Sequence, residues 1–133
     1  MNQTKTSLDK QCEKYWKAII HSKKYCEVCG KPPPFKENEE MGNHNAHHII
    51  TKKNHNLRWD IRNGANLCPS CHKFGNPSAH GNPIWFAEWL KSHRPDDYEY
   101  LKDPKWTKTK VWRISDYQEI LINLKVIHDK IDP

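Results

Sequence analysis

Two Cys-x-x-Cys pairs constrain the fold of this chain more than any other feature of its sequence. The first pair is Cys26 and Cys29, and the second pair is Cys68 and Cys71. Cysteines separated by two residues place both sulfurs on one tetrahedral ion, and Gly30 permits the tight turn that the first pair requires. Because four thiolates leave no open coordination position, the predicted zinc is structural rather than catalytic.

A structural metal suits the composition of the chain. With 133 residues, of which 35% are hydrophobic, the chain is expected to form a single domain with a modest core. Small domains of this kind often depend on a bound metal for stability. The sequence contains no apolar run of the roughly 20 residues that span a membrane, and no signal-peptide core. We therefore expect a cytoplasmic protein without a membrane partner, in which thiols stay reduced and the remaining Cys12 is a buried free thiol.

The charge balance favours a polyanionic partner. The chain has 22 Lys and Arg against 16 Asp and Glu, which gives a formal net charge of +6. This balance is typical of nucleic-acid-binding proteins, although lysine-rich surfaces also occur without such a partner. Six Trp and five Tyr supply aromatic faces that can stack on bases. Core packing remains the expected role of most of these rings.

The segment between the cysteine pairs is predicted to form a small sheet that leads into a helix. Residues 45–51 indicate one strand, and residues 59–67 can contribute a second strand, with Asn63 and Gly64 at a turn or bulge. Pro69 suits the first turn of a helix that begins around the second cysteine pair.

Apolar residues spaced three and four apart predict further helices on both sides of this core. The N-terminal helix is expected over about 7–24, and another helix is expected to begin at Pro83. Residues 96–105 show no clear period and are expected to form a connector. A capping-box pattern at Ser115 predicts the last helix, within a C-terminal extension of about 95–133.

The chemistry is expected to come from histidines, because the cysteine site is closed. His47 and His48 are adjacent, and neighbours on a strand point to opposite faces. We therefore expect one of them to bind a divalent ion and the other to act on a water. His72 follows the last cysteine directly and can supply a second ligand. Phosphodiester hydrolysis needs a cation at the phosphate and a neutral imidazole that accepts a proton from water. An amide such as that of Asn63 can orient this base.

Two strings carry a resemblance to a known family. Residues 46–49 read Ala-His-His-Ile, and residues 63–72 read Asn-Gly-Ala-Asn-Leu-Cys-Pro-Ser-Cys-His. Together they resemble the HNH endonucleases of the His-Me finger, or ββα-metal, class. The resemblance covers about 25–90 and implies an α+β fold, with a ββα-metal core stapled by the four-cysteine zinc site and flanked by N-terminal and C-terminal helices. Residues 57–63 are also similar to phage NinG-type recombination nucleases, which implies a phage or bacterial protein.

The resemblance implies a role for each site residue. His47 is implied to ligate a catalytic divalent ion, His48 to act as the general base, Asn63 to orient that base, and His72 to ligate the same ion. Many relatives carry Asp at the position of His47, so the catalytic metal stays open between Mg²⁺, Mn²⁺ and Zn²⁺. Asn66 is a rival to Asn63 for the middle position.

Other residues are weaker candidates for the same site. His80 lies beyond a Gly-Asn-Pro break and is either a further ligand, a phosphate contact or a structural residue before the next helix. The residues expected to contact nucleic acid are basic and follow the first predicted strand: Lys52, Lys53, Arg58 and Arg62. The two arginines either clamp phosphates or form a salt bridge with Asp60.

These observations favour a metal-dependent endonuclease that nicks or cuts duplex or branched DNA by one-metal catalysis with a histidine base. The alternative is a non-catalytic, zinc-stabilised module that binds DNA or RNA. The coincidence of four polar side chains at the expected spacings favours the enzyme. The sequence does not decide the oligomeric state, and a homodimer through the apolar helices is one alternative to a monomer.

Overall fold

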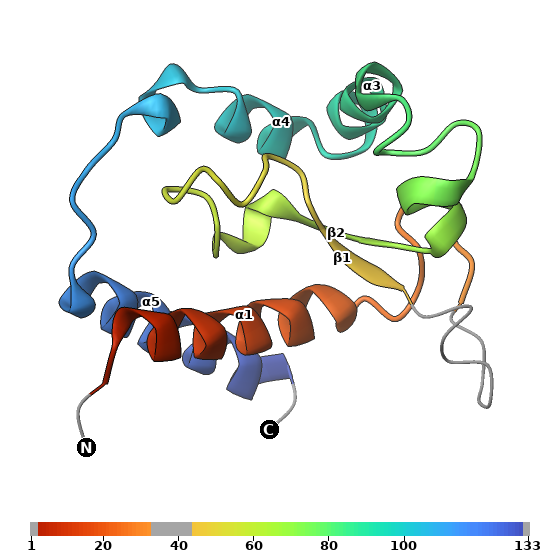
Figure 1. The fold of residues 1–133 in the computed structure, drawn as a ribbon. Coiled ribbons are helices and arrows are strands. Elements are labelled where there is room, and N and C mark those ends of the chain that lie inside the picture. The colour runs from red at the N-terminus through yellow and green to blue at the C-terminus, as the bar shows by residue number, and fades with distance from the viewer. Residues whose placement is uncertain (1–2, 33–43, 132–133) are drawn as a thin grey trace.

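The computed structural model describes residues 3–32 and 44–131 and places a two-stranded ribbon between two layers of helices (Figure 1). Strands β1 (Asn45–His48) and β2 (Gly64–Leu67) pair antiparallel, with Asn45 opposite Leu67 and His48 opposite Gly64. The helical elements are α1 (Lys5–His21), a π-helical turn (Ser70–Phe74), α3 (Pro83–His93), α4 (Pro95–Leu101) and α5 (Ile114–Ile131). Within the described ranges, no helix combines the length and apolar character that crossing a bilayer requires.

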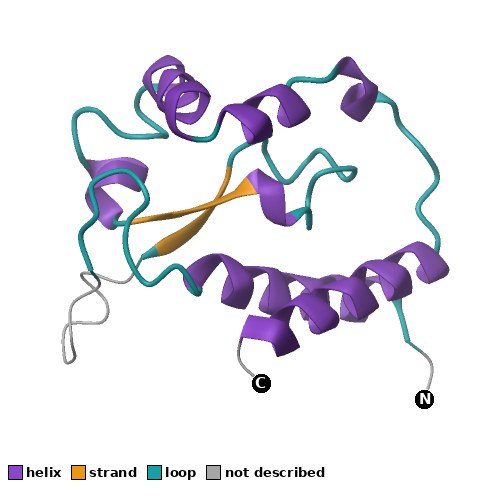
Figure 2. Ribbon diagram, turned by 180° about the vertical axis from the view of Figure 1, so that it is seen from behind, coloured by secondary structure: helices purple, strands orange, loops and turns teal. Residues whose placement is uncertain are grey.

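Helices α1 and α5 lie side by side on one face of the ribbon (Figure 2). The predicted apolar stripe of α1 packs against α5 in a core of buried side chains that also includes Trp59. Helix α1 begins two residues earlier than predicted, because the side chain of Thr4 accepts a hydrogen bond from the Ser7 amide and caps the helix.

Cys12 is fully buried in this core as a free thiol, as expected. Burial, with a contribution from Asp9, raises the pKa of this thiol to about 11, so it is poorly reactive.

The ribbon is shorter than the sequence predicted, because other contacts replace strand pairing at its end. Residues after His48 leave the ladder, and a 3₁₀ turn at Ile61–Asn63 precedes β2. Gly64 lets α1 approach the ribbon closely: a Cβ at this position would contact Ile20 and lie 2.9 Å from Cζ2 of Trp16. This approach brings the Trp16 ring to the end of β1.

The C-terminal extension differs from the prediction in two elements. Helix α4 was not predicted, but Pro95 at its first turn and the acidic side chains of Asp96 and Asp97 favour a helix start there. Helix α5 begins at Ile114, and the side chain of Asp116 accepts a hydrogen bond from the Arg113 amide. The capping box predicted at Ser115 is therefore wrong in register.

Arg94, between α3 and α4, connects this second helical layer to the ribbon. Its guanidinium donates hydrogen bonds to the Asp97 carboxylate at 2.8 Å, the Gly64 carbonyl at 2.9 Å and the Arg62 carbonyl at 3.1 Å. It also lies 3.4 Å from the carboxylate of Glu27, beside the first cysteine pair. One side chain thus joins α4, β2 and the cysteine turn.

Asp97→Asn is expected to lower the free energy of unfolding at pH 7 by about 1–3 kcal/mol, because it weakens hydrogen bonds from two cations. Although burial acts in the opposite direction, the hydrogen bonds and charges of Arg62 and Arg94 hold the pKa of Asp97 below its ordinary value. A lowered pKa means that this stabilisation is present above the unfolded pKa and is lost as the pH falls through the folded one. Urea titrations should therefore show that the difference in unfolding free energy between wild type and Asp97→Asn disappears below about pH 4. A difference in unfolding free energy that is independent of pH would contradict the assignment.

Candidate metal and catalytic site

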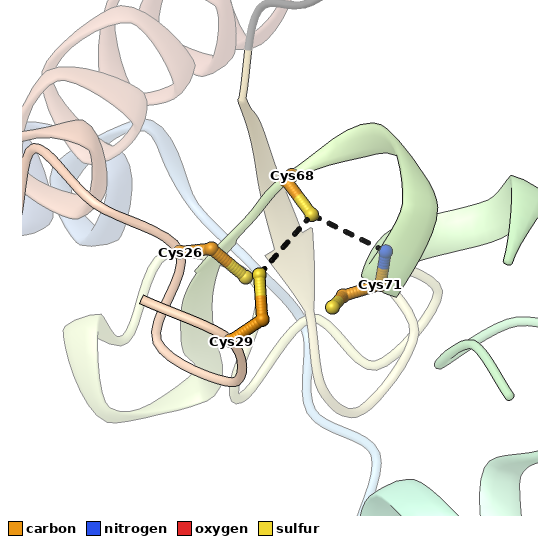
Figure 3. A group of neighbouring side chains, drawn as sticks. All are labelled: Cys26, Cys29, Cys68 and Cys71. Carbon is orange, nitrogen blue, oxygen red and sulfur yellow. Dashed lines mark hydrogen bonds between the residues drawn. The ribbon is translucent and has the colours of Figure 1, made fainter. Parts of the chain in front are cut away.

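The four cysteines of the two Cys-x-x-Cys pairs converge on one point (Figure 3). Their sulfur atoms all lie within 4.8 Å of one another, and Sγ of Cys29 is 3.7 Å from Sγ of Cys68. A tetrahedral zinc with Zn–S bonds of about 2.3 Å separates its sulfurs by about 3.8 Å. A disulfide would bring them to about 2.05 Å, and all four cysteines are free. The residues therefore fit a zinc ion.

The backbone around the cysteines is built to hold this arrangement. Gly30 adopts a left-handed conformation (φ 77°), and its amide donates to the Cys26 carbonyl at 2.8 Å. Burial, followed by the neighbouring sulfurs of Cys68, Cys26 and Cys29, raises the pKa of Cys71. The Cys71 thiol therefore resists losing its proton unless a cation compensates the charge, which agrees with the chemistry of a zinc site.

Asn66, the rival candidate for the middle Asn, belongs to this scaffold. It is buried, and its side chain donates to the Tyr25 carbonyl at 2.9 Å. Its backbone amide donates to the carboxylate of Glu27 at 2.7 Å. Asn66 thus fixes the first cysteine turn against β2.

A second cluster consists of His47, His72 and His80. One ring nitrogen from each lies within 4.8 Å of the other two, and Nε2 of His72 is 3.0 Å from Nε2 of His80. Nitrogens bound to one metal at about 2.0–2.1 Å are separated by about 3 Å. The donor set and the spacing therefore fit a divalent ion such as zinc or another transition metal.

Three different elements supply these rings. His47 comes from β1, His72 from the π-helical turn after the fourth cysteine, and His80 from the segment before α3. The chain after the π-helical turn doubles back, so that the His80 amide donates to the His72 carbonyl at 3.0 Å. The structure thus brings His80, the weakest of the sequence candidates, into the same cluster as the other two.

Two of the three histidines, His47 and His72, are held in the neutral state that metal binding needs. Burial, with the neighbouring charges of His72, His80 and His48, lowers the pKa of His47 to about 3. Burial, with His80 and Lys73, lowers the pKa of His72 to about 4. Both imidazoles are therefore unprotonated near neutral pH and offer a lone pair to a cation.

His48 occupies the opposite side of β1, as the alternation of a strand requires. Its ring stacks on Trp16, with centroids 4.0 Å apart and an interplanar angle of 12°. Its Nε2 lies 2.9 Å from the Arg58 carbonyl. A carbonyl only accepts, so Nε2 carries the proton and Nδ1 of the neutral ring carries the lone pair. Burial is the main cause that lowers the pKa of His48 below its ordinary value.

The sequence predicted that Asn63 orients the His48 ring. Instead, the hydrogen bonds of its side-chain amide go to the backbone of the loop after β1. The side chain accepts from the Ile50 amide at 2.7 Å and donates to the carbonyls of Ile50 at 2.9 Å and Leu57 at 3.1 Å. Asn63 binds the carbonyl of Leu57, and His48 contacts the carbonyl of the next residue, Arg58. Any influence of Asn63 on His48 is therefore indirect, through the loop.

Asn63→Ala is expected to lower the free energy of unfolding by roughly 3 kcal/mol or more, because it leaves three backbone groups of the loop without partners. Chemical denaturation should show this loss, while Asn123→Ala, on the exposed face of α5, should change stability by less than about 0.5 kcal/mol. If both variants change the free energy of unfolding equally, Asn63 does not stabilise the loop.

A cavity of about 320 Å³ joins the two kinds of histidine. His47, His48 and His80 line it, together with apolar side chains of α3 and α4 such as Phe86 and Leu101. His48 and two members of the three-histidine cluster thus border one recess, although the rings of His47 and His48 lie on opposite faces of β1.

The basic residues predicted to contact nucleic acid divide into two groups. Arg58 and Arg62 are engaged within the protein: Arg58 pairs with Asp9 at 2.8 Å, and Arg62 pairs with Asp97 at 2.7 Å. Neither guanidinium makes the salt bridge to Asp60 that the sequence suggested, and neither is free to act as a simple phosphate clamp. Lys52 and Lys53 are exposed on the loop after β1.

Two contributors to this site carry no signal in the sequence. Trp16 belongs to an ordinary apolar helical stripe, and nothing in that pattern indicates that its ring stacks on His48. The Arg58 carbonyl is a backbone group, so the residue type gives no hint of its role.

Comparison with known proteins agrees with this geometry. Residues 26–74 match a family model described as HNH endonuclease. The match confirms the resemblance to that family. The matched segment begins at the first cysteine and ends two residues after His72, so that His80 and the C-terminal extension lie beyond it. No curated protein and no solved structure matches the chain.

Proposed function

We propose that this chain, which carries an HNH endonuclease match at residues 26–74, is a metal-dependent endonuclease that hydrolyses phosphodiester bonds in DNA. The observation that supports this proposal best is the shared recess, which His48 lines together with His47 and His80 of the three-histidine cluster. Hydrolysis of a phosphodiester needs a base and a cation within reach of one phosphate.

His48 is proposed to be the general base. Its Nε2 proton is fixed on the Arg58 carbonyl, which leaves Nδ1 to accept a proton from the attacking water. The Trp16 ring beneath it restricts rotation of the imidazole, so the lone pair keeps one direction. The carbonyl also stabilises the imidazolium that forms, in the way that an acceptor on the distal nitrogen orients a catalytic histidine.

His47, His72 and His80 are proposed to hold the catalytic divalent ion. When bound there, such an ion supplies positive charge to the scissile phosphate and the leaving oxygen. The three side chains would hold the ion from two sides. His72 and His80 come from one segment that folds back on itself, and His47 comes from β1. Zinc on the four cysteines is proposed to keep the π-helical turn, and hence His72, in place.

His80→Ala is expected to weaken binding of Mn²⁺ about tenfold or more, because it removes one of three ligands. Electron paramagnetic resonance titration measures this binding, and Mn²⁺ avoids the thiolate site because it is not a metal that soft thiolate ligands select. His93→Ala, on α3, should bind Mn²⁺ as wild type does. If the two variants behave alike, His80 is not a ligand.

The proposed function is tested by plasmid nicking. Wild-type protein with Mg²⁺ or Mn²⁺ is expected to convert supercoiled plasmid into nicked or linear DNA, and brief addition of EDTA should stop the reaction. Thermal melts of the same samples show whether the fold survives the chelator. A folded protein that retards DNA in a gel but cuts none with any of these ions would support the alternative, a non-catalytic zinc-stabilised DNA-binding or RNA-binding module.

A further inference from the structure

A second hollow lies away from the histidine clusters, where the C-terminal extension meets the loop after β1. It measures about 580 Å³, and its walls carry four lysines and two tryptophans: Lys5, Lys53, Lys108, Lys110, Trp106 and Trp112. We call it the lysine–tryptophan groove. Most of its walls lie outside residues 26–74, which match the HNH endonuclease family.

The groove is a built feature, because two asparagines fasten its walls together. Nδ2 of Asn56 donates to the carbonyls of Trp106 at 2.9 Å and Lys108 at 2.7 Å. Nδ2 of Asn54 donates to the same Trp106 carbonyl at 3.0 Å. The irregular segment after α4 is thus held against the loop that ends at Arg58, whose carbonyl binds His48.

The lining of the groove has the charge and the flat surfaces that a nucleic acid strand requires. No carboxylate lines it, and Lys53 and Lys108 are exposed. The ammonium of Lys110 lies 4.1 Å from the centre of the Trp112 ring. Lysines interleaved with indole rings are the combination that binds a strand through its phosphates and the faces of its bases.

The shape favours a single strand over a duplex. In a duplex the base faces are stacked on one another and cannot reach an indole ring. In a single strand they are free, and a recess of this size admits them one at a time. We propose that the lysine–tryptophan groove binds a single-stranded DNA segment that adjoins the cleaved duplex, with phosphates on Lys53 and Lys108 and bases against Trp106 and Trp112. This inference rests on the proposed function only in taking the bound strand to be an arm of the substrate.

The test compares two double variants that carry the same change of charge. Lys53→Glu with Lys108→Glu alters the groove, while Lys10→Glu with Lys125→Glu alters exposed positions of α1 and α5 outside it. Both pairs are made in a His48→Ala background, so that DNA stays intact. Fluorescence anisotropy then measures binding to a labelled oligothymidylate, a forked duplex with a single-stranded arm, and a blunt duplex.

The groove pair is expected to weaken binding of the oligothymidylate and the forked duplex about tenfold or more, and the blunt duplex by less than about threefold. The slope of log K against log salt for oligothymidylate should fall by about 0.7 for each phosphate contact that is lost. Equal losses with both pairs of variants would overturn the proposal, as would equal losses on all three DNAs or none at all.

A tryptophan variant tests the stacking separately. Trp112→Leu keeps an apolar side chain against the core but removes the indole face, and is expected to weaken oligothymidylate binding about fivefold or more. A melt establishes that the variant folds. If Trp112→Leu unfolds, Trp106→Leu gives the same readout from the other ring. Unchanged binding by a folded tryptophan variant would contradict the stacking.

Cleavage assays separate this inference from the proposed function. In the wild-type background, the groove pair should slow the cleavage of a forked duplex more than the cleavage of plain plasmid. If wild-type protein cuts no DNA and the groove pair still loses single-strand binding, the proposed function fails and the groove stands. If wild-type protein cuts DNA and the groove pair binds every DNA normally, the groove proposal fails alone.

Discussion

His48→Ala is expected to cleave DNA about 10²–10⁴-fold more slowly than wild type, because a positioned general base typically accelerates a reaction by this factor. The residue was chosen from its place beside His47, and the geometry strengthens the choice. With Nε2 bound to the Arg58 carbonyl, Nδ1 is the nitrogen left to accept a proton. Alanine removes that atom and leaves the three rings of the metal-binding cluster in place.

The measurement is the rate of plasmid nicking at saturating Mg²⁺ or Mn²⁺, and DNA affinity and thermal stability are measured on the same preparations. Loss of the stack on Trp16 is expected to cost about 1 kcal/mol of stability, which is too little to unfold the protein. His93→Ala is the control, because it also removes an imidazole that stacks on a tryptophan, at an exposed position of α3. If the His48 variant cuts at the wild-type rate, another group is the base.

Local spacing was enough to predict the parts of the site that depend on neighbours in the chain. Two Cys-x-x-Cys pairs fix their sulfurs on one ion wherever the chain brings the pairs together, and the structure clusters all four. Alternation along a strand predicts that the side chains of His47 and His48 point to opposite faces, and their rings do lie on different sides of β1. The apolar periods of α1, α3 and α5 likewise depend on helix geometry alone.

Contacts between distant segments could not be read from the sequence. His80 reaches the cluster because a turn folds its backbone against His72, and the same residues could have extended away from it. Arg94 joins four acceptors that lie on three separate segments. Helix α4 is too short for an apolar period to mark it, so only its first-turn residues favour it.

The partners of Arg58 and Asn63 differ from the expected ones for a related reason. The sequence placed Arg58 next to Asp60 and suggested a local ion pair, but the fold brings Asp9 of α1 to its guanidinium. The sequence suggested that Asn63 touches the base, but its amide matches the donors and acceptors of the loop backbone instead. In both cases tertiary packing offers a partner that local spacing cannot reveal.

Cys68→Ser is expected to abolish zinc binding and to unfold the ribbon and the π-helical turn. Serine preserves the size of the buried side chain, but it does not provide the soft thiolate that zinc prefers. Structural zinc contributes an apparent 10–16 kcal/mol in small zinc domains, which is as much as the whole stability of a typical domain, about 5–15 kcal/mol. The hydrophobic core of the ribbon is itself built on these cysteines, since Cys26 and Cys68 pack with Ala65, Leu67 and Phe86.

Zinc content measured by mass spectrometry of the metal, together with near-ultraviolet circular dichroism, tests this prediction. Cys12→Ala is the matched control: it removes a fully buried cysteine outside the cluster, so it should keep one zinc and a cooperative melt. The core between α1 and α5 shares no cysteine ligand, so Cys68→Ser should keep part of the helical signal in the far ultraviolet while its nuclease activity disappears. A cooperative melt without bound metal would mean that apolar packing alone holds the ribbon. Zinc binding by the neighbouring Cys71 would then not be what holds His72 in position.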